Sequence, residues 1–382
     1  SFATRNAIRL TRTAAPVSRL VAPKTAARAF SATRVNRVSE TEHKKSVVRE
    51  KEVPVTRWDQ GKGPGAQSRL NVSEKDSQVP YDSPTPAVEG DAIEPLTQEV
   101  YNTMPKTLKD MSIFGKNVIV TGGARGLGNN MARACAEAGA KSVIIFDANQ
   151  ELGDASAAEL HEKSGLPVSF FKVDVRDGAA INAAVDAVVE HYGCPDVLVN
   201  AAGIADSNIK AETYDPAMFR RLIDINLTGT FLMAQSVGRA MMAAGKPGSI
   251  VLVASMSGSI VNYPQEQSCY NASKAGVVQF AKSIASEWAK HDIRVNCISP
   301  GYMDTALNRV PALEAQKKIW KSLTPQNRLG GVDELNGLCV FLASDSSRFM
   351  TGANVLIDGG YFATKQMFEG TMFSMFIIAI TI

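Results

Sequence analysis

Val118-Ile119-Val120-Thr121-Gly122-Gly123-Ala124-Arg125-Gly126-Leu127-Gly128 is the stretch that decides the fold of this 382-residue chain. It begins as a short apolar run, passes through a glycine-rich turn and continues into residues 131–138, whose composition is helical. Glycines let the backbone approach a pyrophosphate closely, and a helix N-terminus presents free amides to it. Glycine also serves ordinary tight turns, so the glycines alone are weak evidence. The order of strand, glycine turn and helix is what predicts dinucleotide binding.

The next apolar run, residues 142–146, ends at Asp147. A carboxylate at this place accepts hydrogen bonds from the adenosine ribose hydroxyls and repels a 2′-phosphate, which favours NAD. Arg125 in the glycine turn acts in the opposite direction, because a guanidinium there could pair with that phosphate. We expect Asp147 to dominate, so NAD is the predicted cofactor, with NADP as the alternative.

Strand-like and helix-like segments continue to alternate along the chain. Strands are expected at 118–120, 142–146, 168–173, 197–199, 249–253, 293–298 and 354–357, and helices at 131–138, 178–192, 215–244 and 269–290. This alternation predicts an α/β fold with one doubly wound parallel sheet covered on both faces. Ligand sites then fall at the carboxyl ends of the strands. The residues at those ends are the glycine turn, Asp147, Asp174, Asn200, Ser255 and Pro300.

Tyr270 and Lys274 stand four residues apart, which places them on one face of the helix expected there. A phenol ordinarily loses its proton near pH ~10, and a nearby positive charge favours the phenolate. A drop of about three pKa units requires roughly 4 kcal/mol, which one ammonium and a cationic cofactor ring could supply. Tyr270 is therefore a candidate general acid and base. On spacing alone, an interfacial tyrosine beside a solvated lysine is the more frequent arrangement.

From about residue 114 to 362 the chain resembles the short-chain dehydrogenases/reductases, a family with a Rossmann fold. The resemblance rests on Thr121-Gly122-x-x-x-Gly126-x-Gly128, on Asn200-Ala201-Ala202-Gly203, where Ala201 replaces a second Asn, and on Tyr270-x-x-x-Lys274. The resemblance implies a catalytic set of Asn226, Ser255, Tyr270 and Lys274. It also implies cofactor contacts from Gly122, Arg125, Gly126, Leu127, Gly128, Asp147, Asp174, Asn200, Gly203, Tyr270, Lys274, Pro300, Gly301, Met303 and Thr305.

The resemblance also implies a role for each catalytic residue. Tyr270 would exchange a proton with the substrate oxygen, and Ser255 would hydrogen-bond that oxygen. Lys274 would lower the pKa of Tyr270 and bind the nicotinamide ribose, while Asn226 would hold a water in a proton relay. Ser257 is the alternative for the hydroxyl role, and Ser255 is preferred because Gly258 follows it by three.

The resemblance extends to the cofactor. It places Asp174 at the adenine, Asn200 at the ribose region, and residues 300–305 at the carboxamide side of the nicotinamide.

Within the family, residues 255–258, 262–265 and 270–274 most resemble fungal D-arabinitol and mannitol dehydrogenases and L-xylulose reductases. Asn262 and Gln265 suit a substrate with several hydroxyls, since each hydroxyl needs a partner once it is desolvated. In the simpler reading these two side chains cap a loop. Residues 302–326 are expected to form a mobile lid, with Gly301 and Gly330 near its ends.

We therefore expect a polyol or ketose substrate and hydride transfer involving a nicotinamide cofactor. Two other functions remain open on this fold: a mitochondrial 3-oxoacyl-thioester reductase of fatty-acid synthesis, and a dinucleotide-sensing protein without turnover. The resemblance implies that the helices at 215–244 and 269–290 pack between subunits, so a homotetramer is expected.

Residues 1–39 contain eight Arg and Lys residues and no Asp or Glu. This composition predicts a mitochondrial transit peptide over residues 1–30 and a location in the matrix, with Arg28-Ala29-Phe30 resembling a processing site. The alternative is a basic arm for RNA or a membrane surface. Because basic residues are not concentrated later in the chain, we expect no nucleic acid partner.

Residues 31–112 carry many charges and prolines without a sustained apolar face, so a mostly unstructured leader is expected before a domain at 113–362. A short helix docking on the domain could form within residues 94–111. The tail 363–382 includes thirteen uncharged, mainly apolar residues at 370–382, fewer than the ~20 that a spanning helix needs. Scattered His and Cys residues form no ligand motif, so no metal is expected.

Overall fold

The computed structural model describes residues 50–56, 67–73, 93–206, 208–305, 308–309 and 313–363. The predicted transit peptide at 1–30 and nearly all of the apolar tail lie outside these residues. Within the leader that was expected to lack regular structure, β1 (Glu50–Thr56) pairs antiparallel with β2 (Gln67–Ser73). The segment 31–112 therefore contains a hairpin that the charge and proline content did not indicate.

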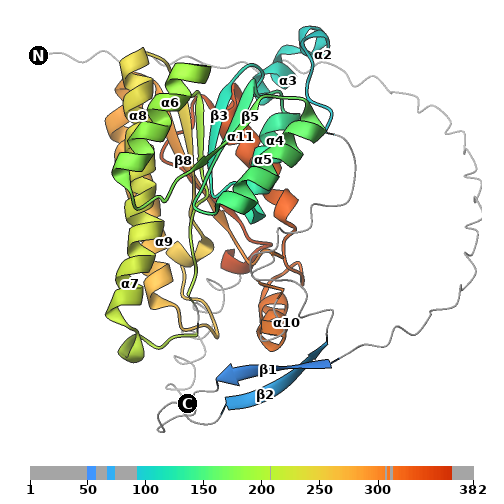
Figure 1. Cartoon of the computed structure of the whole chain (residues 1–382), viewed down its shortest axis with the longest axis vertical. Coiled ribbons are helices and arrows are strands. Elements are labelled where there is room, and N and C mark those ends of the chain that lie inside the picture. The colour runs from blue at the N-terminus through green and yellow to red at the C-terminus, as the bar shows by residue number, and fades with distance from the viewer. Residues whose placement is uncertain are drawn as a thin grey trace, which may run out of the picture. The chain divides into compact units, whose positions relative to one another are not determined.

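The centre of the domain is a parallel sheet of seven strands in the order β5-β4-β3-β6-β7-β8-β9 (Figure 1). Its strands are β3 (Asn117–Thr121), β4 (Ser142–Asp147), β5 (Val168–Lys172), β6 (Val197–Asn200), β7 (Gly248–Val253), β8 (Ile293–Pro300) and β9 (Asn354–Ile357). The predicted doubly wound sheet is confirmed. Because the strand order reverses between β3 and β6, their carboxyl ends flank the crevice where such sheets bind ligands.

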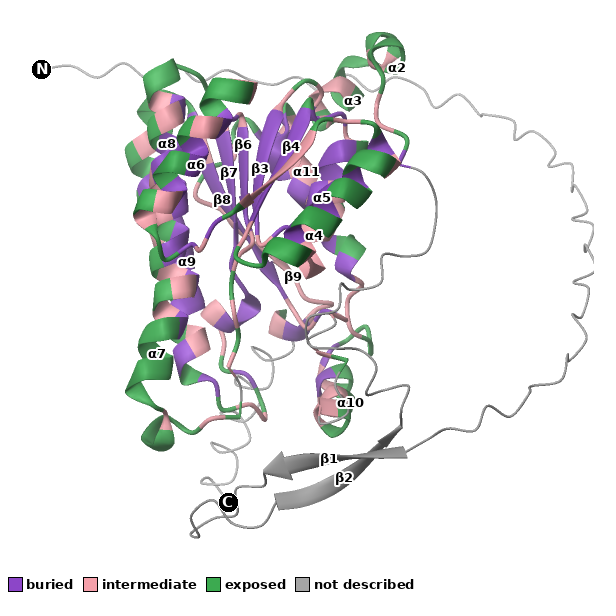
Figure 2. Ribbon diagram, in the orientation of Figure 1, coloured by how far each residue is buried: buried purple, intermediate pink, exposed green. Residues whose placement is uncertain are grey.

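Helices cover both faces of the sheet, and each face has its own core (Figure 2). One core involves α4 (Gly126–Glu137), α5 (Gln150–Ser164) and α11 (Asn336–Ala343), and the other involves α6 (Gly178–Tyr192), α8 (Gly229–Ala244) and α9 (Ser268–Trp288). Neighbouring strand residues point to opposite cores, since Val118 and Val120 belong to the first and Ile119 to the second. Strands buried on both faces explain why their sequences are continuously apolar.

The predicted helical region 215–244 consists of three pieces. α7 (Pro216–Ile223) begins after Asp215, whose carboxylate accepts a hydrogen bond from Ala217 N at 2.8 Å. A π-helical turn, Asp224–Thr228, then leads into α8. The turn carries Asn226 at 0% exposure. Such π turns inside α-helices frequently occur at functional sites, because the wider turn redirects a side chain.

The folded unit begins by Ile93, earlier than the predicted start at residue 113. Ile93 is 4% exposed, and its backbone N donates to Lys163 O at 3.0 Å. The short helices α2 (Gln98–Thr103) and α3 (Lys106–Met111) follow, and the Tyr101 ring stacks on Phe114 with centroids 4.3 Å apart. Docked short helices at 94–111, the alternative left open from the sequence, are what the structure contains.

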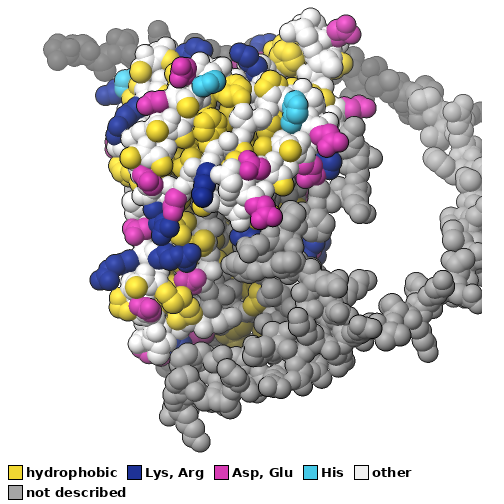
Figure 3. Space-filling model, in the orientation of Figure 1, with side chains coloured by type: hydrophobic (Ala, Val, Ile, Leu, Met, Phe, Trp, Pro, Cys, Tyr) yellow, Lys and Arg dark blue, Asp and Glu magenta, His cyan; other side chains and the backbone are white. Residues whose placement is uncertain are grey.

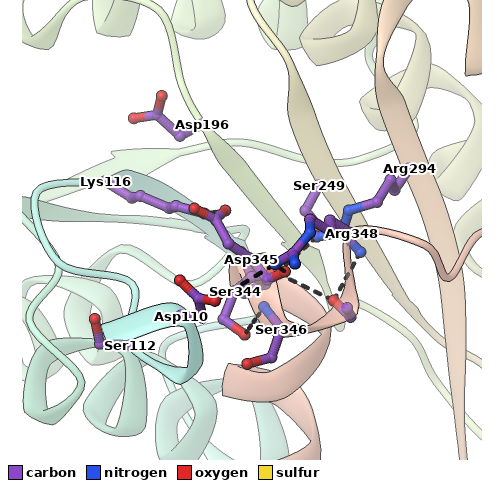
Figure 4. Close-up of polar contacts among 12 residues, drawn as sticks. Asp110, Ser112, Lys116, Asp196, Ser249, Arg294, Ser344, Asp345, Ser346 and Arg348 are labelled. Atoms are coloured by element: carbon purple, nitrogen blue, oxygen red, sulfur yellow. Dashed lines mark hydrogen bonds and ion pairs between the residues drawn. The ribbon is translucent and has the colours of Figure 1, made fainter. Parts of the chain in front are cut away.

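Polar contacts join this N-terminal segment to the residues after α11 (Figure 4). Arg348 lies 3.4 Å from the carboxylate of Asp110, and Lys116 lies 2.7 Å from that of Asp345. Arg294 of β8 donates to the carbonyl oxygens of Leu342 and Ser344. Exposed ion pairs contribute about 0–1 kcal/mol each, so burial of Ile93 should account for more of the docking energy than these pairs.

Ile93→Ala is expected to lower the free energy of unfolding by roughly 2–5 kcal/mol, because it removes a buried side chain and leaves a cavity. Chemical denaturation measures the change. Val100→Ala, at a position 52% exposed on α2, is the matched control and should stay within about 0.5 kcal/mol. Equal, small effects of the two substitutions would contradict the docking of this segment.

The surface seen in Figure 3 carries acidic, basic and hydrophobic side chains interspersed over the helices. Within the described ranges, no helix combines the length and the hydropathy needed to cross a bilayer.

Candidate active site

The glycine turn between β3 and α4 is shaped for close approach of a ligand. Gly122 and Gly126 have φ of 63° and 62°, which lie in the left-handed region that favours glycine. A Cβ on Gly128 would lie 2.3 Å from Gly122 O, so no other residue fits at this position. A Cβ on Gly126 would meet no atom within 4 Å, so space is open beside the start of α4. The predicted neighbours Arg125 and Leu127 flank this residue, and both are partly buried.

The carboxyl ends of β3 and β6 are joined at the switch point of the sheet. Thr121 and Asn200 share a hydrogen bond of 2.5 Å between their side chains, and Thr121 also accepts from Ala202 N. A Cβ on Gly122 would come within 2.9 Å of Ala202. The Asn200 amide donates to Thr230 O at 3.4 Å. Asn200 therefore holds the two strands and α8 together, and its predicted contact with the cofactor ribose stays a prediction.

Asp147 is held beside the glycine turn by two backbone amides. Its carboxylate accepts from Ala124 N at 3.2 Å and from Asn149 N at 3.1 Å. The side chain is partly exposed at the end of β4, where ribose recognition was predicted. Asp174, at the end of β5, instead forms an ion pair with Arg176 at 2.5 Å, which lowers the pKa of Asp174. Its predicted contact with adenine would have to be made beside this pair.

Ser255 and Tyr270 come together because the turn after β7 packs tightly on α9. Ser255 caps the short 3₁₀ helix Met256–Gly258, and a Cβ on Gly258 would lie 2.8 Å from Lys274 O. Burial raises the pKa of Tyr270, and a hydrogen bond with Ser255 partly offsets this. Both hydroxyls accept a hydrogen bond inside the protein, Ser255 from Ser257 N at 3.1 Å and Ser257 from Gln267 Nε2 at 3.2 Å. Of the two, Ser255 is the one that affects the pKa of Tyr270, so Ser255 stays the preferred hydroxyl.

In the protein without a cofactor, Lys274 does not lower the pKa of Tyr270 below its ordinary value as predicted. The Lys274 Nζ lies 5.8 Å from the centre of the Tyr270 ring and donates to Val253 O at 2.9 Å. Lys274 is 5% exposed, and burial lowers its own pKa to about 8. Desolvation therefore outweighs charge at both groups, so a bound cationic ring would have to supply the remaining stabilisation of the phenolate.

Asn226 acts through its neighbours in this structure. Its side-chain oxygen accepts from Ile204 N at 2.8 Å, and its Nδ2 donates to Ile204 O and to the Ser273 hydroxyl. A Cβ on Gly203 would lie 3.2 Å from Asn226 Oδ1 and 3.5 Å from Lys274 Nζ. Asn226 therefore fastens the loop after β6 to α9 at Ser273, the residue before Lys274. Its predicted role in holding a water stays a prediction.

The segment after β8 is fastened at its base. Pro300 is buried, and a Cβ on Gly301 would come within 2.6 Å of Asp358 Cα. Gly301 is therefore required for close packing and not only for a hinge. Gly330 N donates to Tyr302 O, and Asp304 N donates to Gly330 O, which closes the neck of the predicted lid.

Beyond this neck, Thr305 N donates to Met303 O at 2.9 Å, and Met303 is 4% exposed. The described part of the lid includes α10 (Glu314–Leu323). Its mobility stays a prediction.

Sequence reasoning missed an aromatic cluster beside this segment. Tyr302 stacks on Trp320 with ring centroids 4.3 Å apart, and it meets Tyr361 edge to face at 5.3 Å. Tyr302 directly follows Pro300-Gly301, which could have marked it. Trp320 and Tyr361 are not next to any motif in the sequence, so the sequence did not indicate that they pack on Tyr302.

These residues fit a nicotinamide dinucleotide. The open start of α4 suits the pyrophosphate, Asp147 stands where the ribose hydroxyls need acceptors, and Tyr270 and Lys274 lie together further along the same edge of the sheet. Within the described ranges, no group of three or more His, Cys, Asp or Glu residues is arranged to hold a metal ion.

Comparison with known proteins identifies the family of the chain. Residues 122–362 match the model of a family described as enoyl-(acyl carrier protein) reductase. The NADP-dependent mannitol dehydrogenase of Alternaria alternata is 43% identical over 258 residues, which cover 66% of this chain and 95% of that protein. The D-arabinitol 2-dehydrogenase (ribulose-forming) of Candida tropicalis is 38% identical over 262 residues, which cover 65% and 92%.

A solved structure of a short-chain dehydrogenase/reductase is also similar to this chain. The crystal structure of a short-chain type dehydrogenase/reductase from Mycobacterium marinum matches with a TM-score of 0.62 at 36% identity, covering 67% of this chain and 99% of that one. The matched family region starts in the glycine turn and includes Asn226, Ser255, Tyr270 and Lys274. The chain belongs to the short-chain dehydrogenase/reductase family.

Proposed function

We propose that this protein interconverts a secondary alcohol of a polyol and the corresponding ketose, in the manner of a D-arabinitol 2-dehydrogenase. The observation that carries the proposal is the placement of Ser255, Tyr270 and Lys274 together at the carboxyl edge of a sheet that also carries the glycine turn and Asp147. The names of relatives about 40% identical, which include mannitol and D-arabinitol dehydrogenases, support the polyol class.

The side chains have separate tasks in this reaction. Tyr270 takes the proton from the substrate hydroxyl at its phenol oxygen during oxidation and returns it during reduction. Ser255 lies close enough to Tyr270 to lower its pKa and can orient the reacting oxygen. Lys274 supplies a buried positive charge, held by Val253 O, that favours the phenolate. The bound nicotinamide supplies the hydride acceptor or donor and, when oxidised, a positive charge.

For the cofactor we propose a preference for NAD, on the strength of Asp147. One of its oxygens accepts from Ala124 N in the glycine turn, so its charge would meet the 2′-phosphate of NADP. The name of the Alternaria relative specifies NADP, so the proposed preference for NAD would distinguish this protein from that relative.

Asp147→Asn should raise the ratio of kcat/KM with NADP to kcat/KM with NAD by roughly 100-fold. Unit charges about 4 Å apart near a protein surface repel by up to ~4 kcal/mol, and each 1.4 kcal/mol corresponds to a factor of ten. Steady-state kinetics with both cofactors give the ratio. Asp154→Asn, on the exposed surface of α5, is the control that should leave it unchanged. A wild-type enzyme that already favours NADP would contradict the proposal.

A substrate panel tests the proposed activity. We expect the protein to oxidise D-arabinitol or another pentitol or hexitol with NAD. Turnover of acetoacetyl thioesters with NADPH, without polyol turnover, would instead establish the 3-oxoacyl-thioester reductase. Tight dinucleotide binding without turnover of either class would establish the sensing protein.

We also propose that the protein is a homotetramer, with subunits meeting across α8 and α9. These helices line a groove of about 370 Å³ that includes Phe231, Phe280 and Trp288. Phe231 is 40% exposed and meets Phe280 edge to face at 5.9 Å, so a large apolar ring stands at the surface. A second copy would bury it. Sedimentation equilibrium should give four times the chain mass, and a monomer mass would refute the proposal.

Import into the mitochondrial matrix is proposed from the acid-free basic segment at the start of the chain. Mass spectrometry of protein isolated from mitochondria should find a mature N-terminus near residue 31. An intact Ser1 on the cellular protein would count against import.

A further inference from the structure

Two side chains of the connection between Ser255 and Tyr270 are joined by hydrogen bonds to Tyr302, which follows β8. Asn262 is 4% exposed, and its Nδ2 donates to the Tyr302 hydroxyl at 3.0 Å. The Tyr302 hydroxyl in turn donates to Gln265 Oε1 at 2.7 Å. Sequence reasoning paired Asn262 with Gln265, and the structure shows that Tyr302 joins them.

The direction of these hydrogen bonds decides which way each amide faces. A phenol has one proton, which Tyr302 gives to Gln265, so its oxygen must accept from Asn262. The nitrogen of Asn262 therefore faces Tyr302, and its oxygen faces away. That oxygen is buried and has no hydrogen-bond partner among the residues that the structure describes. A buried acceptor left in this state costs about 1–3 kcal/mol, so the site favours an incoming donor.

Gln265 presents the complementary group. Because its oxygen is used by Tyr302, its Nε2 faces away from the phenol, and no described residue accepts a hydrogen bond from it. The chain thus offers one acceptor, Asn262 Oδ1, and one donor, Gln265 Nε2, on the two sides of a single phenol. A hydroxyl group both donates and accepts, so neighbouring hydroxyls of one molecule can satisfy both positions.

The connection that carries Asn262 and Gln265 is held at both of its ends. Gln267 Nε2 donates to the Ser257 hydroxyl, and Asn271 Nδ2 donates to Ile260 O, which ties the connection to the turn after Ser255 and to the first turn of α9. Tyr302 is fixed by its stack on the buried Trp320 of α10.

α10 is fastened in turn. Asn208 and Gln316 exchange two amide hydrogen bonds, at 3.0 and 3.3 Å, which join α10 to the loop after β6. The phenol therefore cannot turn away without disrupting these contacts.

We propose that Asn262, Gln265 and Tyr302 form a subsite for the hydroxyls of the substrate that do not react, with Asn262 Oδ1 accepting from one hydroxyl and Gln265 Nε2 donating to its neighbour. This inference rests on the proposed polyol activity and assigns to these residues the preference for a polyhydroxylated chain over a simple alcohol. Tyr302 is a positioning residue, because it fixes the directions of both amides.

The test compares a pentitol with 2-pentanol, which has the same chain length but only the reacting hydroxyl. Asn262→Leu should lower kcat/KM for the pentitol by roughly 10- to 100-fold, because the hydrogen bond to a neighbouring hydroxyl is lost. For 2-pentanol, kcat/KM should change by less than about twofold. Tyr302→Phe keeps the ring that stacks on Trp320, and we expect the same selective loss. Asn102→Leu, on the exposed face of α2, is the control for the same exchange outside the site.

The outcomes separate this inference from the proposed function. Parallel losses on both substrates, or an unchanged pentitol rate in a folded variant, would overturn the subsite while leaving polyol activity in place. If Asn262→Leu fails to fold, as judged by its melting curve, Tyr302→Phe decides the question by the same two rates. A wild-type protein that oxidises 2-pentanol but no pentitol or hexitol would instead overturn the proposed function, and the subsite with it.

Discussion

Tyr270→Phe is expected to lower kcat/KM for polyol oxidation by roughly 10²–10⁴-fold, the usual contribution of a positioned general acid or base. The substitution removes only the hydroxyl, so the fold and the glycine turn should be unaffected. Fluorescence titration with NADH should give a dissociation constant close to that of the wild type. Rates and titration together separate loss of proton transfer from loss of cofactor binding.

The role of Tyr270 as acid and base also predicts how the rates of the wild-type enzyme change with pH. Burial raises the pKa of Tyr270 in the protein, and the positive charge of the bound oxidised cofactor lowers it again. Oxidation of the alcohol needs the phenolate, so its kcat/KM should rise with pH through this pKa. Reduction of the ketose needs the phenol and should fall over the same range.

Tyr101→Phe is the matched control, because Tyr101 stacks on Phe114 in the N-terminal segment and lies outside the site. It should leave both rates and the cofactor affinity unchanged. Full activity of Tyr270→Phe would contradict the proposed chemistry and favour the dinucleotide-sensing function.

Lys274→Met should inactivate the enzyme and stabilise the fold at neutral pH. The pKa of Lys274 is about 8 in the folded protein against an ordinary value of 10.5, because burial disfavours its ammonium. Below pH 8 the folded state keeps a desolvated charge that is solvated after unfolding. With about 1.36 kcal/mol per pKa unit, the buried charge destabilises the native state of the wild type by roughly 3 kcal/mol. Lys274→Met removes this penalty but also the hydrogen bond to Val253 O, which is worth about 1 kcal/mol, so the net gain in stability is smaller by that amount.

The sign of the pH effect follows from the lowered pKa. The destabilisation is complete below about pH 8 and disappears as pH rises toward 10.5, where the unfolded chain also loses its proton. Thermal unfolding should therefore show a higher Tm for Lys274→Met at pH 6 to 7, with the difference shrinking toward pH 10. Activity should fall by roughly 10²-fold or more, since the buried ammonium that favours the phenolate is removed.

Lys282→Met, on the exposed face of the same helix, is the control and should change stability by no more than about 0.5 kcal/mol. Retention of full activity by Lys274→Met would contradict the role of the buried charge. A lower Tm at neutral pH, or a Tm difference independent of pH, would contradict the linkage. The expected pattern is a gain in stability where function is lost, as is common for active-site groups held in unfavourable surroundings.

Much of the fold could be predicted from local patterns. The seven strands were found because strands buried on both faces are short, apolar and followed by turn residues, as in β3 before Gly122 and β7 before Ser255. The hairpin of β1 and β2 and the docking of Ile93 were not found. The hairpin carries no sustained apolar alternation that would mark its strands, and the docking of Ile93 depends on a contact with the distant Lys163.

The sequence by itself determined the doubly wound sheet, the glycine turn and the spacing of Tyr270 and Lys274, because these depend on periodicity and on residues close together in the chain. Only the tertiary structure decided the electrostatics and the exact partners. Desolvation raises the pKa of Tyr270 against the expected direction, Asn226 is used inside the protein, and Tyr302 joins Asn262 to Gln265. Burial and hydrogen bonding between distant segments exist only once the chain has packed, so no local pattern encodes them.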